Sequence, residues 1–313
     1  MVRVADGIYS AGGAKSDSMS NRVVLAKAIT VESINGPAQT WLVGAGPNGS
    51  SAVRCAYVAT GAVLAGFTLT NGHSRTVGNY VYELSGGAFL DYAGILNHCT
   101  LRGNSAGLAG GGAYCEFGGK LNNCIVWSNA PSNWYVSSGE WTNCCTLPAF
   151  GVNSITAAPQ FMAAGNHHLQ AGSACIDAGV FVPGLMGDRE GTPRPLDGNV
   201  DGAALPDIGA YEFASAVADT DGDQASDFSE YVADTAGTDG ADWFHISAIS
   251  NQAFFFESSA NRQYTLLYRT NLVEGGWINV ASQTDVMGNG VVIYLSGPSD
   301  FPACFYTVQV EVP

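Results

Sequence analysis

The feature that most constrains the fold of this chain is a short internal repeat in its first two thirds. Each clear copy contains a brief apolar run and then a Leu or Trp three positions before a Cys. The clear copies are residues 87–104, 112–129 and 133–146, and a weaker copy is residues 63–71. Cys99 precedes Cys124 by 25 residues, and Cys124 precedes Cys144 by 20. Periods of this length are typical of solenoids.

Apolar and polar residues alternate within each copy, as in the Leu-Asn-His-Cys-Thr-Leu sequence of residues 96–101. A period of two indicates strands and not helices. Short strands with Gly and Asn corners stack into a parallel β-helix, in which each coil covers its neighbour. We therefore expect an all-β chain with such a solenoid over residues 1–213. The Asn residues at positions 71, 104 and 129 fall at predicted turns.

The repeat also gives the eight cysteines a structural interpretation. Inward side chains of successive coils form ladders, and a buried thiol packs like a small hydrophobe. The predicted ladders are Phe67, Cys99, Cys124 and Cys144, and Leu64, Leu96, Leu121 and Trp141. We expect most cysteines to be reduced core residues, with disulfides as the alternative. Cys144 and Cys145 should point to opposite faces of one strand, so a bond between them is not expected.

The repeat ends in a distinct sequence between residues 173 and 213. It contains Ser-Ala-Cys-Ile-Asp-Ala-Gly at 173–179, Gly-Thr-Pro-Arg-Pro at 191–195 and Asp-Ile-Gly-Ala-Tyr-Glu-Phe at 207–213. Together with Asn-Asn-Cys-Ile-Val-Trp-Ser-Asn at 122–129, it resembles right-handed parallel β-helix proteins of bacterial surfaces, of the choice-of-anchor Q and polymorphic outer-membrane-like repeat type. The resemblance covers roughly residues 1–213 and implies a right-handed solenoid. Activity in that family is mostly unassigned.

Four carboxylates near the end of the solenoid are candidates for catalysis. They are Asp177, Asp188, Asp197 and Asp207. Parallel β-helices also carry polysaccharide lyases and hydrolases, and glycoside hydrolysis needs paired acids. The same Asp residues stand beside Gly and Pro in turn-like contexts, where Asp bonds to the backbone and where Arg189 and Arg194 can tie loops down. We expect a structural role, with a second cation site or a polysaccharide-active enzyme as alternatives.

Two further groups of residues are weaker candidates. His167 and His168 have no third ligand at a recognisable spacing, so we do not expect a metal or acid–base site there. Trp127, Trp134 and Tyr135 either stack on sugars or pack in the core and turns, and we expect packing.

The first residues suggest an open end. Residues 2–4 look like a strand that no capping segment precedes, and residues 1–7 contain no apolar targeting segment. An uncovered solenoid end exposes strand edges, which invite pairing with another chain. We expect this end to be covered by a missing segment or by a neighbouring subunit in a homo-oligomer or filament.

Residues 219–230 have the ligand spacing of a calcium loop. Oxygen atoms fall at positions 1, 3, 5, 7, 9 and 12 of the EF-hand pattern. The predicted ligands are Asp219, Asp221, Asp223, the carbonyl of Ala225, Asp227 and Glu230. Gln224 replaces the Gly of the sharp turn, which weakens the match. The segment resembles thrombospondin type 3 and dockerin loops, and we expect Ca²⁺ to rigidify a linker over residues 214–242, with a solvated acidic hinge as the alternative.

Residues 243–313 return to alternation and predict a small antiparallel β-sandwich. The expected strands are residues 244–246, 253–256, 264–269, 277–280, 290–295 and 304–310. The sequence Arg-Gln-Tyr-Thr-Leu-Leu-Tyr-Arg-Thr-Asn-Leu at 262–272 resembles fibronectin-III-like modules at the C-termini of secreted bacterial proteins. In such proteins that module implies adhesion or sorting, and a plain spacer is the alternative.

The formal charge of −15 is unevenly distributed. Residues 1–176 carry 8 basic and 7 acidic side chains, whereas residues 177–242 carry 2 and 15. A net negative charge argues against nucleic acid as a partner, and no apolar run is long enough to span a membrane. The combined expectation is a secreted or cell-surface structural or adhesive protein, with a polysaccharide or cell-surface ligand.

Overall fold

The computed structural model describes the chain except for residues 6, 17, 34–39, 164–165, 184–187, 189–191, 193, 202, 216–228, 230–231, 234, 236–243, 251, 271–275, 298–303 and 312–313. The chain divides into two compact units, Met1–Ala214 and Ser215–Pro313. Each unit is described by itself below.

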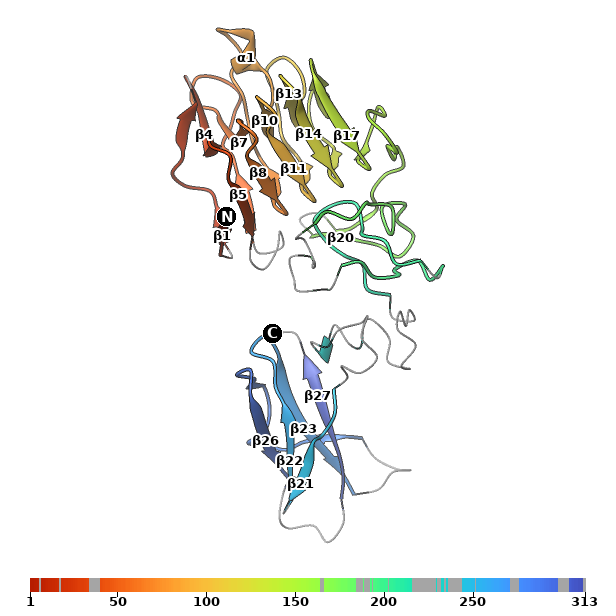
Figure 1. The fold of residues 1–313 in the computed structure, drawn as a ribbon. Coiled ribbons are helices and arrows are strands. Elements are labelled where there is room, and N and C mark those ends of the chain that lie inside the picture. The colour runs from red at the N-terminus through yellow and green to blue at the C-terminus, as the bar shows by residue number, and fades with distance from the viewer. Residues whose placement is uncertain are drawn as a thin grey trace. The chain divides into compact units, whose positions relative to one another are not determined.

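Within the described residues, the first unit is a solenoid of three six-stranded sheets that the chain visits in turn (Figure 1). Sheet A contains β1 (Val2–Val4), β5 (Thr30–Ser33), β8 (Val63–Ala65), β11 (Ile95–Asn97), β14 (Gly119–Asn122) and β17 (Gly139–Thr142). Sheet B contains β2 (Gly7–Tyr9), β6 (Thr40–Val43), β9 (Thr68–Thr70), β12 (Thr100–Arg102), β15 (Ile125–Trp127) and β18 (Cys145–Thr146). Sheet C contains β3 (Ala14–Ser16), β4 (Met19–Leu25), β7 (Val53–Val58), β10 (Ala88–Leu90), β13 (Ala113–Cys115) and β16 (Trp134–Val136). The parallel β-helix is thus confirmed.

Strand register confirms both predicted ladders. Leu96 pairs with Leu64 on one side and with Leu121 on the other, and Leu121 pairs with Trp141. The second ladder occupies the position just before the paired residues Thr68, Thr100, Ile125 and Cys145. Its members Phe67, Cys99, Cys124 and Cys144 are each at most 1% exposed. Both ladders belong to one continuous apolar core that runs along the solenoid axis.

The corner between sheets A and B has the same two-residue form in four successive coils. Its first residue has a positive φ, and its second is the inward member of the Phe/Cys ladder. The first residues are Gly66 (φ 66°), His98 (45°), Asn123 (51°) and Asn143 (49°). Asn and His adopt left-handed conformations more readily than most residues. One left-handed residue per coil therefore turns the chain from one sheet into the next.

The three predicted turn asparagines occupy two different positions. Asn71 has a φ of 52° at the exit from sheet B, where the neighbouring coils place Gly103 and Ser128. Asn104 and Asn129 lie one position later and stack on each other. The Nδ2 of Asn104 donates to Oδ1 of Asn129 at 3.0 Å. The loops that follow, from sheet B to sheet C, differ in length from coil to coil and cover residues 44–52, 71–87, 103–112 and 128–133. The longest contains α1 (Tyr80–Glu83).

The residues that follow β18 in the first unit, 147–214, form a closing segment. This segment closes the end of the solenoid and folds over sheet B. Phe150 packs against Trp141, with ring centroids 5.4 Å apart, and so covers the end of the core. The hairpin of β19 (Phe161–Ala163) and β20 (Asn166–Leu169) follows. A second apolar cluster joins sheet B to this closing segment, and it contains Ile125, Cys145, Leu169, Cys175, Ile176 and Ile208.

The second unit consists of antiparallel sheets, which agree with the predicted sandwich. One sheet has the order β21 (Ala248–Ser250), β22 (Ala253–Glu257) and β26 (Val292–Ser296). The other is centred on β23 (Gln263–Arg269), which pairs with β24 (Ile278–Asn279), β25 (Val286–Met287) and β27 (Phe305–Glu311). The strand predicted at residues 244–246 is wrong. The strand lies at β21, and Phe244 instead packs against Phe256 and Tyr264 in the core. Among the described residues, no helix is sufficiently long and apolar to cross a membrane.

Candidate functional site

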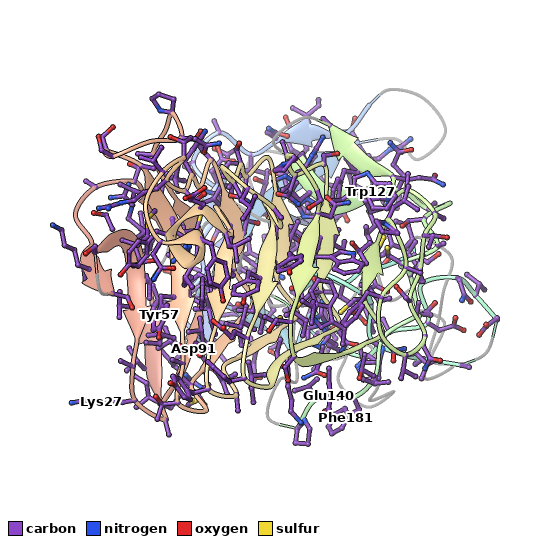
Figure 2. The ribbon with its side chains drawn as sticks, turned by 90° about the horizontal axis from the view of Figure 1, so that it is seen from above. Lys27, Tyr57, Asp91, Trp127, Glu140 and Phe181 are labelled. Carbon is purple, nitrogen blue, oxygen red and sulfur yellow. The ribbon has the colours of Figure 1, made fainter. Side chains whose placement is uncertain are left out.

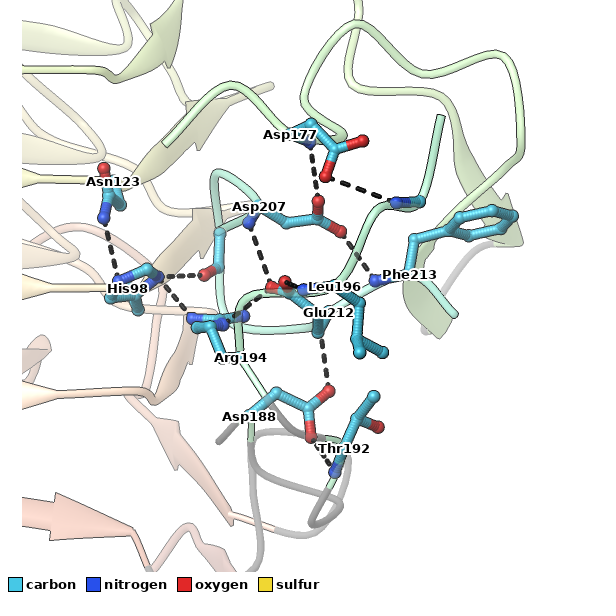
Figure 3. A network of polar contacts seen from close by, with 12 residues as sticks. His98, Asn123, Asp177, Asp188, Thr192, Arg194, Leu196, Asp207, Glu212 and Phe213 are labelled. Carbon is cyan, nitrogen blue, oxygen red and sulfur yellow. Dashed lines mark hydrogen bonds and ion pairs between the residues drawn. The ribbon is translucent and has the colours of Figure 1, made fainter. Parts of the chain in front are cut away.

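The four candidate carboxylates lie in the closing segment of the solenoid, and Figure 3 shows three of them, Asp177, Asp188 and Asp207. All four are largely buried. Asp207 is 1% exposed, and Asp177, Asp188 and Asp197 are 7–8% exposed. A buried carboxylate is costly unless hydrogen bonds or a cation compensate its charge. The partners of these oxygens therefore indicate what each group does.

Glu212 and Arg194 form the centre of the network. The Nε of Arg194 donates to Oε2 of Glu212 at 2.8 Å, and the two side chains are 2% and 0% exposed. Glu212 also accepts the N–H of Leu196 at 3.0 Å and that of Asp207 at 2.9 Å. Asp188 accepts the N–H of Glu212 itself at 2.9 Å. The carboxyl group of Glu212 thus holds residues 194–196 and Asp207 against its own segment, and its backbone N–H binds Asp188.

Asp207 and Asp177 extend the hydrogen-bond network to other turns of the closing segment. Asp207 accepts the N–H of Asp177 at 2.8 Å through Oδ1 and that of Phe213 at 2.6 Å through Oδ2. Asp177, whose φ is 52°, accepts the N–H of Asn199 at 2.7 Å. Asp197 accepts the N–H of Asp201 at 3.1 Å. Each of the four candidate acids therefore binds backbone N–H groups.

Burial also shifts the titration of these groups. It raises the pKa of Glu212 from 4.5 to about 7, although Arg194 acts in the opposite direction. Burial and the neighbouring Glu212 raise the pKa of Asp207 well above its usual value. One guanidinium faces two buried carboxyl groups, so the pair retains a proton into the neutral range.

The corner residues of sheets A and B attach this network to the solenoid. The Nδ2 of Asn123 lies 2.8 Å from Nε2 of His98, and Nδ1 of His98 contacts Nη1 of Arg194. Asn123 accepts the N–H of Val180 at 2.9 Å. Asn143 donates to the carbonyl of Ala178 at 2.7 Å. The same left-handed residues that turn the chain thus dock its closing segment.

Sequence reasoning placed Arg194 correctly as a group that ties loops to carboxylates, but it missed two participants. Glu212 was part of the closing motif without an assigned role, and His98 was treated only as a strand residue. The sequence of residues 207–213 has acidic residues at both 207 and 212, and this pair was the one sign that Glu212 takes part in the network. Arg189 lies outside the described residues.

The two adjacent histidines serve packing. His167 is 4% exposed and packs between Trp41 and Phe161, with ring centroids 5.6 Å and 5.1 Å away. Burial lowers the pKa of His167 to about 4, with the positive charge of Arg102 as a smaller cause. His168 packs against Tyr211 at 4.0 Å. Within the described residues, no three His, Cys, Asp or Glu side chains gather closely enough to hold a metal ion.

The three aromatic candidates differ in environment. Trp134 packs edge-on against Trp141 in the core, and its indole donates to the carbonyl of Pro148 at 3.0 Å. Tyr135 is 45% exposed and stacks on Tyr114 outside sheet C. Trp127, labelled in Figure 2, lies beside a pocket of about 290 Å³ between sheet B and β19. The pocket lining also includes Arg102, Ser128, Gln160 and Phe161.

The cysteines of the solenoid are buried free thiols. Cys144 lies in the axial core, and its neighbour Cys145 lies in the cluster under the closing segment. The expected opposite orientation of these two residues is confirmed. All six predicted calcium ligands, from Asp219 to Glu230, lie outside the described residues, so the calcium site stays a prediction.

Comparisons with known proteins found no match: no family model, curated protein or solved structure matches this chain. The family resemblance of the closing motif therefore stays a prediction.

Proposed function

We propose that this chain is a structural β-solenoid protein, secreted or displayed at a cell surface, with an adhesive role. The observation that carries the proposal is the use of the acidic side chains. Asp177, Asp188, Asp197 and Asp207 accept backbone N–H groups, and Glu212 is paired with Arg194. Carboxylates used in this way hold loops together and leave the solenoid as a rigid scaffold.

The rival proposal is a polysaccharide lyase or glycoside hydrolase. One observation favours it, because carboxyl groups with raised pKa values, such as Asp207 and Glu212, are common in acid catalysis. The deciding experiment incubates the full chain with polygalacturonate, alginate and a neutral xylan, and measures new reducing ends and unsaturated products. The structural proposal expects none. Product formation that disappears in Asp207→Asn while the fold is retained would establish the enzyme instead.

Assembly through the first coil is part of the proposal, with a second copy of the chain as the partner. β1 and β2 lie at the edges of their sheets, and Val2 and Ile8 are 47% and 68% exposed. Edge strands with apolar side chains favour pairing with another strand. The closing segment covers the opposite end, so pairing through β1 and β2 forms a two-fold dimer and not an open filament.

Light scattering of the full chain over a concentration series tests the dimer. The expected mass approaches twice the monomer's 32.5 kDa. Ile8→Lys should shift it to the monomer, whereas the matched control Leu108→Lys, at another exposed position, should not. A monomeric mass at all concentrations would reject assembly through this end.

Calcium binding by residues 219–230 is the remaining part of the proposal. The spacing of hard oxygen ligands supports it, and the role of the ion would be to stiffen the linker. Calorimetric titration of the full chain with CaCl₂ should give a saturable heat that Asp221→Asn removes. The absence of heat up to millimolar Ca²⁺ would contradict it.

A further inference from the structure

Among the described arginines of the solenoid, Arg102 differs in that no hydrogen bond or ion pair joins it to another described residue. Arg3, Lys120 and Arg194 form ion pairs with carboxylates at 2.8–3.0 Å. Arg54 donates to the backbone carbonyls of Leu84 and Ser85. The guanidinium of Arg102 lies over the face of Phe161, whose centroid is 5.1 Å away, and among the described residues its Nη1 is buried without a hydrogen bond.

Arg102 lines a pocket together with an aromatic residue. Arg102 and Trp127 are paired neighbours on β12 and β15, and both side chains stand on the outer face of sheet B. The residues just before them on the two strands, Leu101 and Val126, point into the axial core instead. The pocket of about 290 Å³ is closed on its other side by residues 158–161 and Ala163.

The pocket has a clear chemical character. Its lining contains one formal charge, the guanidinium of Arg102, and no carboxylate. The nearby His167 is neutral at pH 7, since its pKa is lowered to about 4. Ser128 and Gln160 contribute a hydroxyl and an amide, and Trp127 and Phe161 contribute ring surfaces. The volume is near the lower end of ligand pockets, roughly 300 Å³, which suits a single ring.

We propose that this pocket binds one carboxylated sugar unit of an acidic polysaccharide. The carboxylate of the sugar pairs with Arg102, whose planar guanidinium favours bidentate recognition of carboxylates. The apolar face of the sugar ring packs on Trp127. Hydroxyl groups on the ring hydrogen-bond with Ser128 and Gln160. A carboxylate there also supplies a partner for the guanidinium, whose buried Nη1 has none among the described residues.

The proposal deepens the adhesive part of the proposed function, because it names the class of ligand. It does not depend on catalysis, on calcium or on the dimer. Failure to bind an acidic sugar would reject the pocket but leave the light-scattering and product measurements to decide those other points.

The test uses two sugars that differ only at C6. D-galacturonate carries a carboxylate there, and D-galactose carries a hydroxymethyl group. The readout is the indole N–H resonance of Trp127 in the full ¹⁵N-labelled chain, assigned by its disappearance in Trp127→Phe. We expect a saturable shift with D-galacturonate, with a Kd of about 10 mM or lower, and at least tenfold weaker binding of D-galactose and of acetate.

Arg102→Gln should weaken the binding of D-galacturonate at least tenfold. Arg75→Gln is the matched control, because Arg75 also stacks on an aromatic ring, Tyr82, but contacts the carbonyl of Ser18 outside this pocket. It should bind like the parent chain. Arg102→Lys keeps the charge without the planar fork, and should bind more weakly while remaining folded even if the Gln variant does not fold.

Three results would overturn the proposal. They are the absence of a saturable shift, equal binding of galactose or acetate, and unchanged binding by a folded Arg102→Gln or Arg102→Lys variant.

Discussion

The adjacent residues Cys144 and Cys145 belong to two different apolar cores. Cys144 packs in the axial core with Cys124 and Trp141, whereas Cys145 packs under the closing segment with Cys175. The strand between the cores is therefore buried on both faces. This position explains why two thiols can be neighbours in sequence without forming a disulfide.

We expect Cys304 to react much faster with thiol reagents than the other seven cysteines. Cys304 is partly exposed, and the other cysteines are buried. Burial raises the pKa of Cys55 and of Cys115 to about 12, which leaves little reactive thiolate. Titration with a chromogenic disulfide should show one fast thiol in the native protein and eight in guanidinium chloride. Cys304→Ser should remove the fast phase, and fewer than eight thiols after denaturation would indicate a disulfide.

Removal of Arg194 should destabilise the closing segment strongly. Arg194→Met leaves the carboxyl of Glu212 buried without its cation, which typically costs about 3–5 kcal/mol. Urea denaturation at pH 8 measures the free energy of unfolding. Lys120→Met breaks an ion pair in which both side chains are far more exposed, and it should leave the midpoint unchanged. Equal effects of the two substitutions would contradict the central role assigned to Arg194.

The stabilising contribution of Glu212 should fall as the pH rises from about 4.5 to 7. The pKa of Glu212 is raised to about 7 in the folded protein, so the folded chain retains a proton that the unfolded chain has released. The contribution of Glu212 is therefore complete below pH 4.5 and is lost as the pH rises through 7. A shift of this size corresponds to about 3 kcal/mol.

Urea denaturation at pH 5, 6, 7 and 8 checks this dependence. Glu212→Gln removes the titrating group, so the stability of the parent chain relative to this variant should decline over this range. The comparison cancels the opposite contribution of His167, whose pKa is lowered to about 4. A difference between the two chains that stays constant from pH 5 to 8 would show that the carboxyl pair is fully ionised.

At the left-handed corner residue Asn143, a Gly variant should be more stable than an Ala variant, which is the reverse of the usual order. Asn143→Ala and Asn143→Gly both lose the hydrogen bond to Ala178, but only Ala meets the cost of a φ of 49°. The Gly variant should be more stable by about 1 kcal/mol. At Asn122, on the extended strand β14, the Ala variant should be the more stable one. Thermal unfolding of the four variants is the measurement, and the same order at both positions would refute the argument.

The solenoid was predictable because its period is local. The spacing of Leu96, Leu121 and Trp141 directly encodes neighbours in one ladder, so sequence distance translates into spatial distance. In the second unit, the first strand was predicted a few residues before its actual position at β21. The prediction relied on Phe244, which is apolar because it packs in the core and not because it lies in a strand. Apolar character alone does not separate these two roles.

The network at the closing segment was less predictable because its contacts are long-range. His98 meets Arg194 across 96 residues, and nothing in the local sequence around His98 indicates that contact. The motif at residues 207–213 indicated that the segment is special, but not that Glu212 is its centre. Likewise, the absence of a carboxylate beside Arg102 in the described part of the chain is a property of the folded chain alone.

The corner between sheets A and B keeps one length in each of four coils, whereas the loops from sheet B to sheet C do not. Insertions in the B-to-C loops therefore leave the registers of all three sheets intact. The B-to-C loops thus form a vertex at which a gene can gain or lose codons without disturbing the ladders. New recognition elements could be grafted there, along one ridge of the solenoid.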